Sequence, residues 1–293
     1  MTQASDKNAK ATPSPRRIHK VRSLLNAYFK VVSWAGLASP DRTVVLTYHS
    51  IRPPGLYKYS TSAALFEAHL EWLAAHCTVV GFEEVLLPAE QPRGKPRVAI
   101  TFDDGYQDNV EIALPLLQKY RLTATFFITT GLLQKDTPTL NRLAANFGNS
   151  LEQMGPLNFA GLRALDAAGM HIGAHTHSHH NLRQLSPKEQ REELYKSRAI
   201  LEDALGKVVP TMSYPYGLPG YAVDAGVSRA SLETGYRLAA TVHLRAVRPL
   251  DDPGRIPRFV LTDENLQDLR TIVFGGMDVV GWYQDVTFSL LRK

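Results

Sequence analysis

The chain has 293 residues, of which 44% are hydrophobic, and its formal net charge is +5. This length can bury one barrel-sized core or two smaller ones, and we expect one domain with tails. The excess charge is N-terminal, because residues 1–42 hold 8 Lys/Arg and 2 Asp/Glu, against 25 and 26 in the remainder. The near-neutral remainder has no basic stripe, which excludes a nucleic-acid-binding surface of the usual kind on the domain.

Residues 1–15 are polar and charged and contain Pro and Ser, a composition typical of disorder. From Ile18 onwards, apolar residues recur at steps of three and four with basic residues between them, which predicts a basic amphipathic helix. Its apolar positions are Ile18, Val21, Leu25, Tyr28, Val32 and Ala35. Its basic positions are Arg16, Arg17, Lys20, Arg22 and Lys30. Residues 1–41 are therefore a basic arm with a helix.

Three interpretations of this helix stay open. It packs against the domain, which we favour, it lies on an anionic membrane surface, or it is a poor signal peptide. Asn26 and Lys30 interrupt the apolar run, and the run starts late, which weakens the third interpretation. No run reaches the ~18 to 20 apolar residues of a transmembrane helix. We expect a cytoplasmic protein that is soluble or at most peripheral at the membrane surface.

Short apolar runs alternate with helical patterns over residues 42–262, which favours an α/β fold with a parallel sheet. The predicted strands are 43–48, 97–102, 123–128, 170–174, 209–213, 238–242 and a stretch around Phe259. The predicted helices are 62–76, 109–119, 159–168 and 187–205, the last with Ser186 and Glu189 as a capping box and Gly206 as its stop. Seven such strands predict a barrel.

The only cysteine, Cys77, excludes a disulfide framework and is interpreted as a small buried apolar residue. Residues 131–157 contain no clear strand and are predicted to be a long loop with a helical turn, of the kind that shapes substrate clefts. Residues 263–293 are predicted to be a helical tail, broken at Gly275-Gly276. The tail either closes the barrel, which we favour, or seeks another surface. Its apolar face contains Val279, Trp282, Val286 and Leu290.

Three polar motifs follow predicted strands, at the rim where α/β barrels collect catalytic groups. They are Thr101-Phe102-Asp103-Asp104-Gly105, His175-Thr176-His177-Ser178-His179 and Ser213-Tyr214-Pro215-Tyr216-Gly217. Each motif has an ordinary alternative: Asp-Asp-Gly is also a common turn, and the second motif is also a polar, His-rich loop. Their occurrence at strand ends of one chain favours a metal site.

Adjacent residues on a regular strand point to opposite faces, and Gly105 lets the chain bend after Asp103 and Asp104. One carboxylate can then bind a metal while its neighbour acts as a general base. His175 and His179, four residues apart, can converge on the same ion. Three protein ligands leave open the coordination position that a metal-dependent hydrolase needs. We interpret the remaining histidines of this region as bystanders, namely His171, His177 and His180.

With these motifs the chain resembles the NodB-type polysaccharide deacetylases, carbohydrate esterase family 4, over roughly residues 42–260. The matching segments are Leu46-Thr47-Tyr48-His49, Thr101 to Gly105, Phe126-Phe127, Gly173 to His179 with Leu182, and Ser213 to Gly217. The Asp-Asp and His-x-x-x-His motifs in this order are specific, and the others support them. The Tyr-Pro-Tyr-Gly form resembles the branch that acts on secreted or cell-surface amino sugars.

The resemblance implies a distorted (β/α) barrel of the NodB-homology type. It also implies a divalent metal ion held by Asp104, His175 and His179, with Asp103 as the base in the hydrolysis of an N-acetyl group. The nitrogen and oxygen ligands favour zinc, although cobalt or nickel would fit nearly as well.

For the substrate, the resemblance implies binding positions at Tyr48, Tyr214, Pro215 and Tyr216, with the backbone N–H of Tyr216 stabilising the oxyanion.

Two departures from the family pattern matter. Many members carry an arginine that holds the catalytic aspartate where this chain has Ser213, and Arg258 is our candidate for a replacement. The late Leu-x-His segment that usually supplies the general acid is also absent. His49 is our preferred acid, and His243 is the alternative.

The leading hypothesis is a metal-dependent N-deacetylase of an amino-sugar polysaccharide or of a lipid-linked glycan precursor. An O-acetyl esterase on the same fold is an alternative, as is a non-catalytic carbohydrate-binding protein. The complete Asp103, Asp104, His175 and His179 set argues against the last of these. The expected partner is an N-acetylated amino-sugar glycan, with no nucleic acid and with peripheral membrane contact through the N-terminal helix.

Overall fold

A parallel sheet forms the centre of the computed structural model, which describes residues 42–53, 59–88, 94–147 and 155–290. Its strands run in the order β10-β1-β5-β6-β7-β8-β9, and β4 also pairs with β5. The strands are β1 (Thr43–Tyr48), β4 (Thr78–Val80), β5 (Arg97–Phe102), β6 (Thr125–Ile128), β7 (His171–Ala174), β8 (Thr211–Ser213), β9 (Leu238–Ala240) and β10 (Phe259–Val260). Two short strands, β2 (Ser50–Ile51) and β3 (Ser60–Thr61), pair separately.

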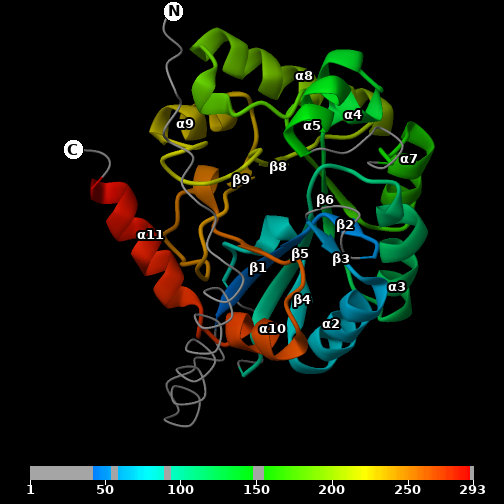
Figure 1. The fold of residues 1–293 in the computed structure, drawn as a ribbon, viewed down its shortest axis with the longest axis vertical. Coiled ribbons are helices and arrows are strands. Elements are labelled where there is room, and N and C mark those ends of the chain that lie inside the picture. Colours follow the sequence, from blue (N-terminus) through cyan, green and yellow to red (C-terminus); the bar gives the residue numbers. More distant parts are fainter. Residues whose placement is uncertain (1–41, 54–58, 89–93, 148–154, 291–293) are drawn as a thin grey trace, which may run out of the picture.

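Helices lie around the outside of this sheet (Figure 1). They are α2 (Ala63–His76), α3 (Leu114–Lys119), α4 (Thr130–Leu133), α5 (Thr137–Phe147), α7 (Phe159–Ala167), α8 (Pro187–Leu205), α9 (Ala225–Glu233), α10 (Leu266–Val273) and α11 (Asp278–Leu290). A π-helical turn, Asn109–Ala113, leads into α3. The capping box at Ser186 and the stop at Gly206, which is in the left-handed conformation, are confirmed for α8.

The two ends of the sheet approach each other through the segment that leads into β10. Ile256 forms a parallel bridge with Ala240 of β9, and three residues later Phe259 of β10 pairs with Leu46 of β1. The sheet therefore curls into a distorted (β/α) barrel, which confirms the predicted fold class.

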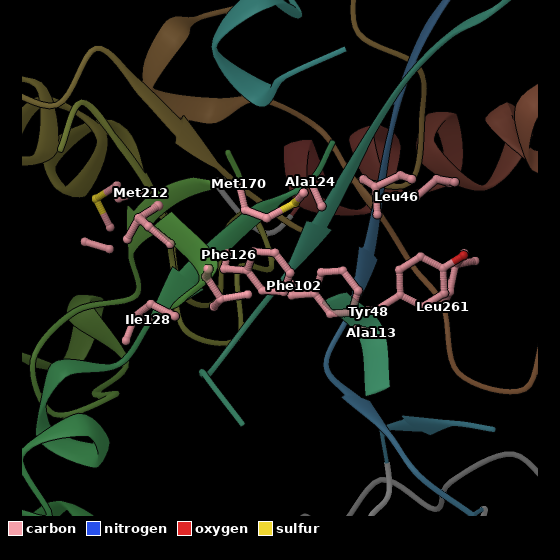
Figure 2. Close-up of a cluster of buried hydrophobic side chains, with 14 of the residues drawn as sticks. Leu46, Tyr48, Phe102, Ala113, Ala124, Phe126, Ile128, Met170, Met212 and Leu261 are labelled. Atoms are coloured by element: carbon pink, nitrogen blue, oxygen red, sulfur yellow. The ribbon is translucent and has the colours of Figure 1, made fainter. Parts of the chain in front are cut away.

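The two faces of the sheet contribute to different cores, because side chains alternate along each strand. Val45, Ala99 and Phe127 point into the barrel and pack with Ala240 and Ile256. On the opposite face Tyr48, Phe102 and Phe126 lie on neighbouring strands, and their rings form a row between the sheet and the helices (Figure 2). The ring centroids of Tyr48 and Phe102 are 5.6 Å apart, and those of Phe102 and Phe126 are 4.6 Å apart. Phe66 of α2 packs edge-on against Tyr48 and Phe102, so this row holds β1 and β5 against α2.

Two predictions about secondary structure were incomplete. Residues 131–157 were expected to be a long loop with a helical turn, but they contain the eleven-residue helix α5. The Asp136 carboxylate caps its first turn by accepting hydrogen bonds from the backbone N–H and hydroxyl of Thr139. The sequence Asp-Thr-Pro at 136–138 carries this start signal. The short strands β2, β3 and β4 were also missed, because two- and three-residue strands leave no periodic pattern.

The C-terminal tail is helical and breaks at Gly275-Gly276 as predicted. Its apolar face is not turned towards the barrel, however, since Val279 is 44% exposed and Trp282 is 64% exposed. The predicted N-terminal arm and helix lie outside the described residues. Among the residues described, no helix is long and apolar enough to cross a membrane.

Candidate metal centre

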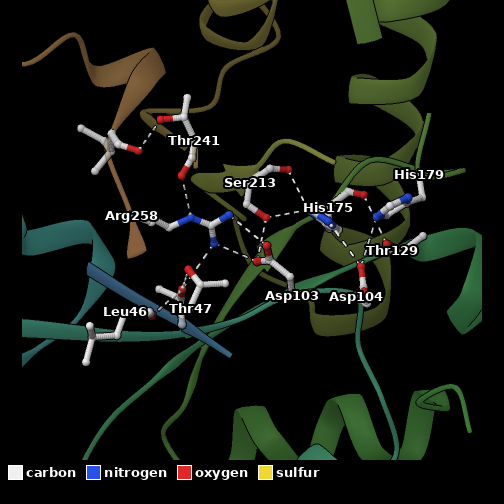
Figure 3. Close-up of polar contacts among 12 residues, drawn as sticks. Leu46, Thr47, Asp103, Asp104, Thr129, His175, His179, Ser213, Thr241 and Arg258 are labelled. Atoms are coloured by element: carbon white, nitrogen blue, oxygen red, sulfur yellow. Dashed lines mark hydrogen bonds and ion pairs between the residues drawn. The ribbon is translucent and has the colours of Figure 1, made fainter. Parts of the chain in front are cut away.

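Asp103, Asp104 and His175 lie at the carboxyl ends of β5 and β7, next to the end of β8 (Figure 3). The alternation along β5 places Asp103 on the same face as Ala99 and Thr101, so its side chain points into the mouth of the barrel. Asp104 departs from the strand, with φ at 74°, and Gly105 follows with φ at 86°. This bend turns the second carboxylate towards the histidines instead of away from them.

Asp104, His175 and His179 converge on one point, and all three are buried. The Oδ1 atom of Asp104 lies 3.4 Å from Nε2 of His175 and 3.2 Å from Nε2 of His179. Each residue offers a ligand atom within 4.8 Å of the other two. Tyr106 donates a hydrogen bond of 2.8 Å to the other carboxylate oxygen of Asp104, Oδ2. The set therefore has the composition and the convergence of a three-ligand metal site.

The hydrogen bonds of His175 fix which of its nitrogens is available to a metal. Nδ1 lies 2.9 Å from the backbone carbonyl of Ser213, and because a carbonyl can only accept, Nδ1 carries the proton. Nε2 is then left with its lone pair on the side of Asp104. Burial lowers the pKa of His175 to about 4, so the ring is neutral at physiological pH. This is the protonation state in which a histidine binds a metal.

His179 is held by the tight loop that follows β7. Thr176 and His179 both have positive φ, and the Thr176 hydroxyl accepts a hydrogen bond from the backbone N–H of His179. The Glu193 carboxylate, on α8, accepts hydrogen bonds from the backbone N–H and the hydroxyl of Ser178. Helix α8 therefore holds this loop from outside the barrel.

Asp103 forms an ion pair with Arg258, the arginine predicted from the sequence to be its partner. The guanidinium donates to both carboxylate oxygens, at 2.8 and 2.9 Å, and to the carbonyl of Thr241 at 3.1 Å. Burial alone raises the pKa of the Asp103 carboxyl, but Arg258 and then His175 outweigh burial and hold this pKa below its usual value. Ser213 donates a further hydrogen bond of 3.0 Å to Asp103. Asp103 is therefore charged at neutral pH.

His49 lies at the end of β1, beside these carboxylates. Tyr48 of β1 pairs with Phe102 of β5, so His49 and Asp103 follow neighbouring positions, and after Arg258 and His175 a charge on His49 also lowers the pKa of Asp103. The ring stacks on Tyr59 with centroids 5.1 Å apart, and Nδ1 has no hydrogen-bond partner among the described residues. Asn109 donates a hydrogen bond to the backbone carbonyl of His49.

The histidines that the sequence analysis set apart as an alternative acid or as bystanders make contacts outside the ligand set. His243, the alternative acid, donates from Nε2 to the carbonyl of Gly281 in α11 at 3.2 Å, so this nitrogen faces that helix. His171 is part-exposed beside Glu83, while His177 contacts Thr130 and His180 contacts Arg142.

Three of the four residues predicted to bind substrate are buried. Tyr48 and Tyr214 are 0% and 1% exposed, and they point away from the barrel mouth into the core. The Tyr48 hydroxyl is hydrogen-bonded to Nδ1 of His69, and the Tyr214 hydroxyl donates a hydrogen bond to the carbonyl of Gly254. Pro215 is also buried. Tyr216 alone is exposed at the site, with its ring centroid 5.2 Å from that of His179.

Two residues of the centre were not assigned a role from sequence. Tyr106 contacts Asp104, which it follows by two positions. Its closeness in sequence to the Asp-Asp motif is the feature from which this contact could have been predicted. Ser213 was noted only as the place of a missing arginine, but its hydroxyl contacts both Asp103 and Nδ1 of His175, the latter at 2.5 Å. Ser213 joins Asp103 to His175 only in three dimensions, so no sequence spacing reveals this contact.

A distorted (β/α) barrel with a buried Asp/His/His set and an ion-paired aspartate at its carboxyl rim defines a protein built for hydrolytic chemistry at that rim. Comparison with known sequences agrees: residues 90–239, about half of the chain, match the family described as polysaccharide deacetylase. The chain belongs to this family.

A poly-β-1,6-N-acetyl-D-glucosamine N-deacetylase of Staphylococcus aureus is 28% identical over 254 residues, which cover 78% of this chain and 82% of the relative. Among solved structures, IcaB from Ammonifex degensii is 25% identical, with a TM-score of 0.62, over 76% of this chain and 93% of its own. The Streptococcus pyogenes deacetylase PplD, in complex with acetate, has a TM-score of 0.67 at 22% identity and covers 80% and 99%. The last comparison concerns the fold alone.

Proposed function

We propose that this protein is a metal-dependent N-deacetylase of a polysaccharide that contains N-acetylglucosamine. The observation that carries the proposal is the pairing, at one barrel rim, of a buried Asp104/His175/His179 set with an aspartate held by Arg258. The substrate class is supported by the Staphylococcus aureus relative, which is named for its action on poly-β-1,6-N-acetyl-D-glucosamine.

The proposed metal is zinc, because two imidazole nitrogens and one carboxylate oxygen are a donor set that zinc accepts readily. Asp104, His175 and His179 would hold it. The bound ion would supply a Lewis acid that polarises the acetyl carbonyl and makes water more acidic.

Asp103 is the proposed general base. Its carboxylate is buried next to the ligand set and remains charged because Arg258 and Ser213 donate three hydrogen bonds to it. A charged carboxylate in this position can take the proton from the water that attacks the acetyl group. Arg258 donates hydrogen bonds to both oxygens of the carboxylate, which fixes its orientation and restricts rotation of the Asp103 side chain.

His49 is the proposed proton donor to the departing amine, since its ring lies beside the carboxylates and its Nδ1 makes no other described hydrogen bond. Tyr216 is the proposed contact for the sugar, and its backbone N–H is the proposed donor to the developing oxyanion. The exposure of Tyr216 and its proximity to His179 support this placement.

Acetate release tests the proposal. Purified protein, stripped with a chelator, is supplied with or without zinc and with β-1,6-linked N-acetylglucosamine oligomers, O-acetylated xylan or a polyprenyl-linked N-acetylhexosamine. We expect zinc-dependent release from the first. Asp103→Asn should lower kcat about a hundredfold to ten-thousandfold while zinc remains bound. Asp166→Asn, at a surface ion pair with Lys207, is the matched control and should leave kcat unchanged.

Release from xylan alone would instead identify an O-acetyl esterase. Zinc binding with no acetate released from any of the three would favour a carbohydrate-binding role, and full activity in Asp103→Asn would overturn the assignment of the base.

A further inference from the structure

Helix α11 carries an apolar stripe on the side that faces away from the barrel. Val279 and Trp282 are 44% and 64% exposed, and their spacing of three places them on one side of the helix. Gly281 lies on the opposite side, where a Cβ atom would come within 2.6 Å of the Leu244 carbonyl. Gly281 therefore lies on the side of α11 that touches the barrel, and the exposed stripe with Val279 and Trp282 faces away from it.

The chain that precedes the described domain enters it at the first turn of α11. Arg42 donates from Nη2 to both carboxylate oxygens of Asp278, at 2.8 and 2.9 Å, and Asp278 is the first residue of α11. The 41 residues before Arg42 are therefore tethered at one end of the exposed stripe. A tethered segment has an effective concentration of the order of millimolar at such a site, far above that of a free partner.

We propose that residues 18–35 form a helix that packs antiparallel along the exposed stripe of α11. In this orientation the spacings between apolar residues match. Counted from Ala35 backwards and from Val279 forwards, each segment has an interval of three residues followed by an interval of four. The opposed positions are Ala35 with Val279, Val32 with Trp282, and Tyr28 with Val286. Residues 36–41 are enough for the reversal, since connections of two to five residues join antiparallel helices.

The lengths of the two segments also fit. Eighteen helical residues span about 27 Å and the thirteen residues of α11 span about 20 Å, so the proposed helix covers the whole stripe. The occupant is this chain's own segment and not a lipid surface or a second copy, because the tether and the matching steps favour the local partner.

Disulfide trapping tests the contact in the full chain. Val32→Cys combined with Trp282→Cys should oxidise to a cross-link within one chain. Ser33→Cys with Trp282→Cys is the matched control, and it should cross-link at least tenfold more slowly because residue 33 lies on the other side of the proposed helix. Cys77 does not compete, since it is buried and burial raises its pKa to about 12. Equal cross-linking of both pairs, or a cross-link between two chains, would overturn the proposal.

Hydrogen exchange gives a second, independent measurement. In the full chain, Val32→Asp should speed amide exchange in α11 at least tenfold, whereas Ser33→Asp should leave it unchanged. Unchanged exchange in both variants would contradict the proposed packing. So would protection of α11 that depends on adding vesicles of phosphatidylglycerol and phosphatidylcholine, since that result would assign the stripe to a lipid surface.

Discussion

At the scale of single residues, two adjacent carboxylates acquire different environments. Asp103 points into the barrel mouth and is held by Arg258, whereas Asp104 leaves the strand and faces two histidines. For both, burial raises the pKa, but Arg258 beside Asp103 and a hydrogen bond from His179 to Asp104 outweigh burial and lower it, so both are charged. The proposed base and the proposed metal ligand both need charged carboxylates, and the bend at Asp104 and Gly105 lets neighbouring positions serve the two roles.

Removal of Arg258 tests how far Asp103 depends on it. Arg258 is fully buried, so Arg258→Gln leaves a buried carboxylate without its counter-ion. We expect the free energy of unfolding to fall by about 3 to 5 kcal/mol. We also expect kcat/KM to fall, with partial recovery as pH is raised, because the pKa of Asp103 increases. Urea unfolding and a pH profile measure the two effects.

The control for this change is Arg255→Gln. Arg255 forms an ion pair with Asp252 three residues away and is 35% exposed, so its loss should cost about 1 kcal/mol or less. If Arg258→Gln were no more harmful than this control, the ion pair with Asp103 would not stabilise the centre.

At the scale of secondary-structure elements, a buried polar contact joins α2 to β1. His69 of α2 and the hydroxyl of Tyr48 are 3.0 Å apart, and both residues are inaccessible to solvent. Burial lowers the pKa of His69 to about 4, against about 6.5 in an unfolded chain. The contact is therefore made by a neutral histidine, and the packing of α2 on the sheet depends on that neutral form.

This contact predicts a pH-dependent stability. Below pH 6.5 the unfolded chain binds a proton at His69, whereas the folded chain does not until about pH 4, so stability is lost as pH falls across that window. The loss should be about 3 kcal/mol between pH 7 and pH 4. Urea unfolding should show that the free energy of unfolding of His69→Gln falls by about 3 kcal/mol less than that of the parent chain over the same pH range.

His76→Gln, on the exposed end of the same helix, is the control and should keep the pH dependence of the parent chain. An identical dependence in the parent and in His69→Gln would show that His69 titrates normally in the fold.

At the scale of the whole molecule, the barrel gathers one centre from segments far apart in the chain. Arg258 and Asp103 are separated by 155 positions, and they meet because β10 lies beside β1, which lies beside β5. The ligand set likewise joins the end of β5 to the loop after β7. A metal held by this set would tie two parts of the barrel together, and its binding would favour the folded chain.

Zinc should therefore raise the melting temperature of the chelator-stripped protein. At a zinc concentration a hundred times Kd, binding contributes about 2.7 kcal/mol, which corresponds to a rise of about 5 to 10 °C. Differential scanning calorimetry of the parent chain and of His179→Ala measures this shift, and the variant should lose it. His171→Ala, at a part-exposed histidine on the first residue of β7, should retain it. No rise in the parent chain would contradict the metal site.

The sequence by itself determined the fold class, most of the longer elements and the residues of the candidate centre. Alternating apolar runs and helical patterns predicted the parallel barrel, and the borders of β1, β5 and α8 follow the predicted ranges. Asp103, Asp104, His175 and His179 were identifiable because their motifs are local and end recognisable strands. Local signals of this kind survive in a sequence, since they depend only on neighbouring residues.

The tertiary structure alone decided which side each residue faces and which distant residues meet. Parallel strands are apolar on both faces, so no alternation revealed that Tyr48 and Tyr214 point into the core. The contact of His243 with α11 and the pairing of Arg258 with Asp103 appear only in the closed barrel. The apolar face of α11 could be read from its spacing, but its outward direction depends on Gly281, which permits the close approach of the helix to the barrel on the opposite side.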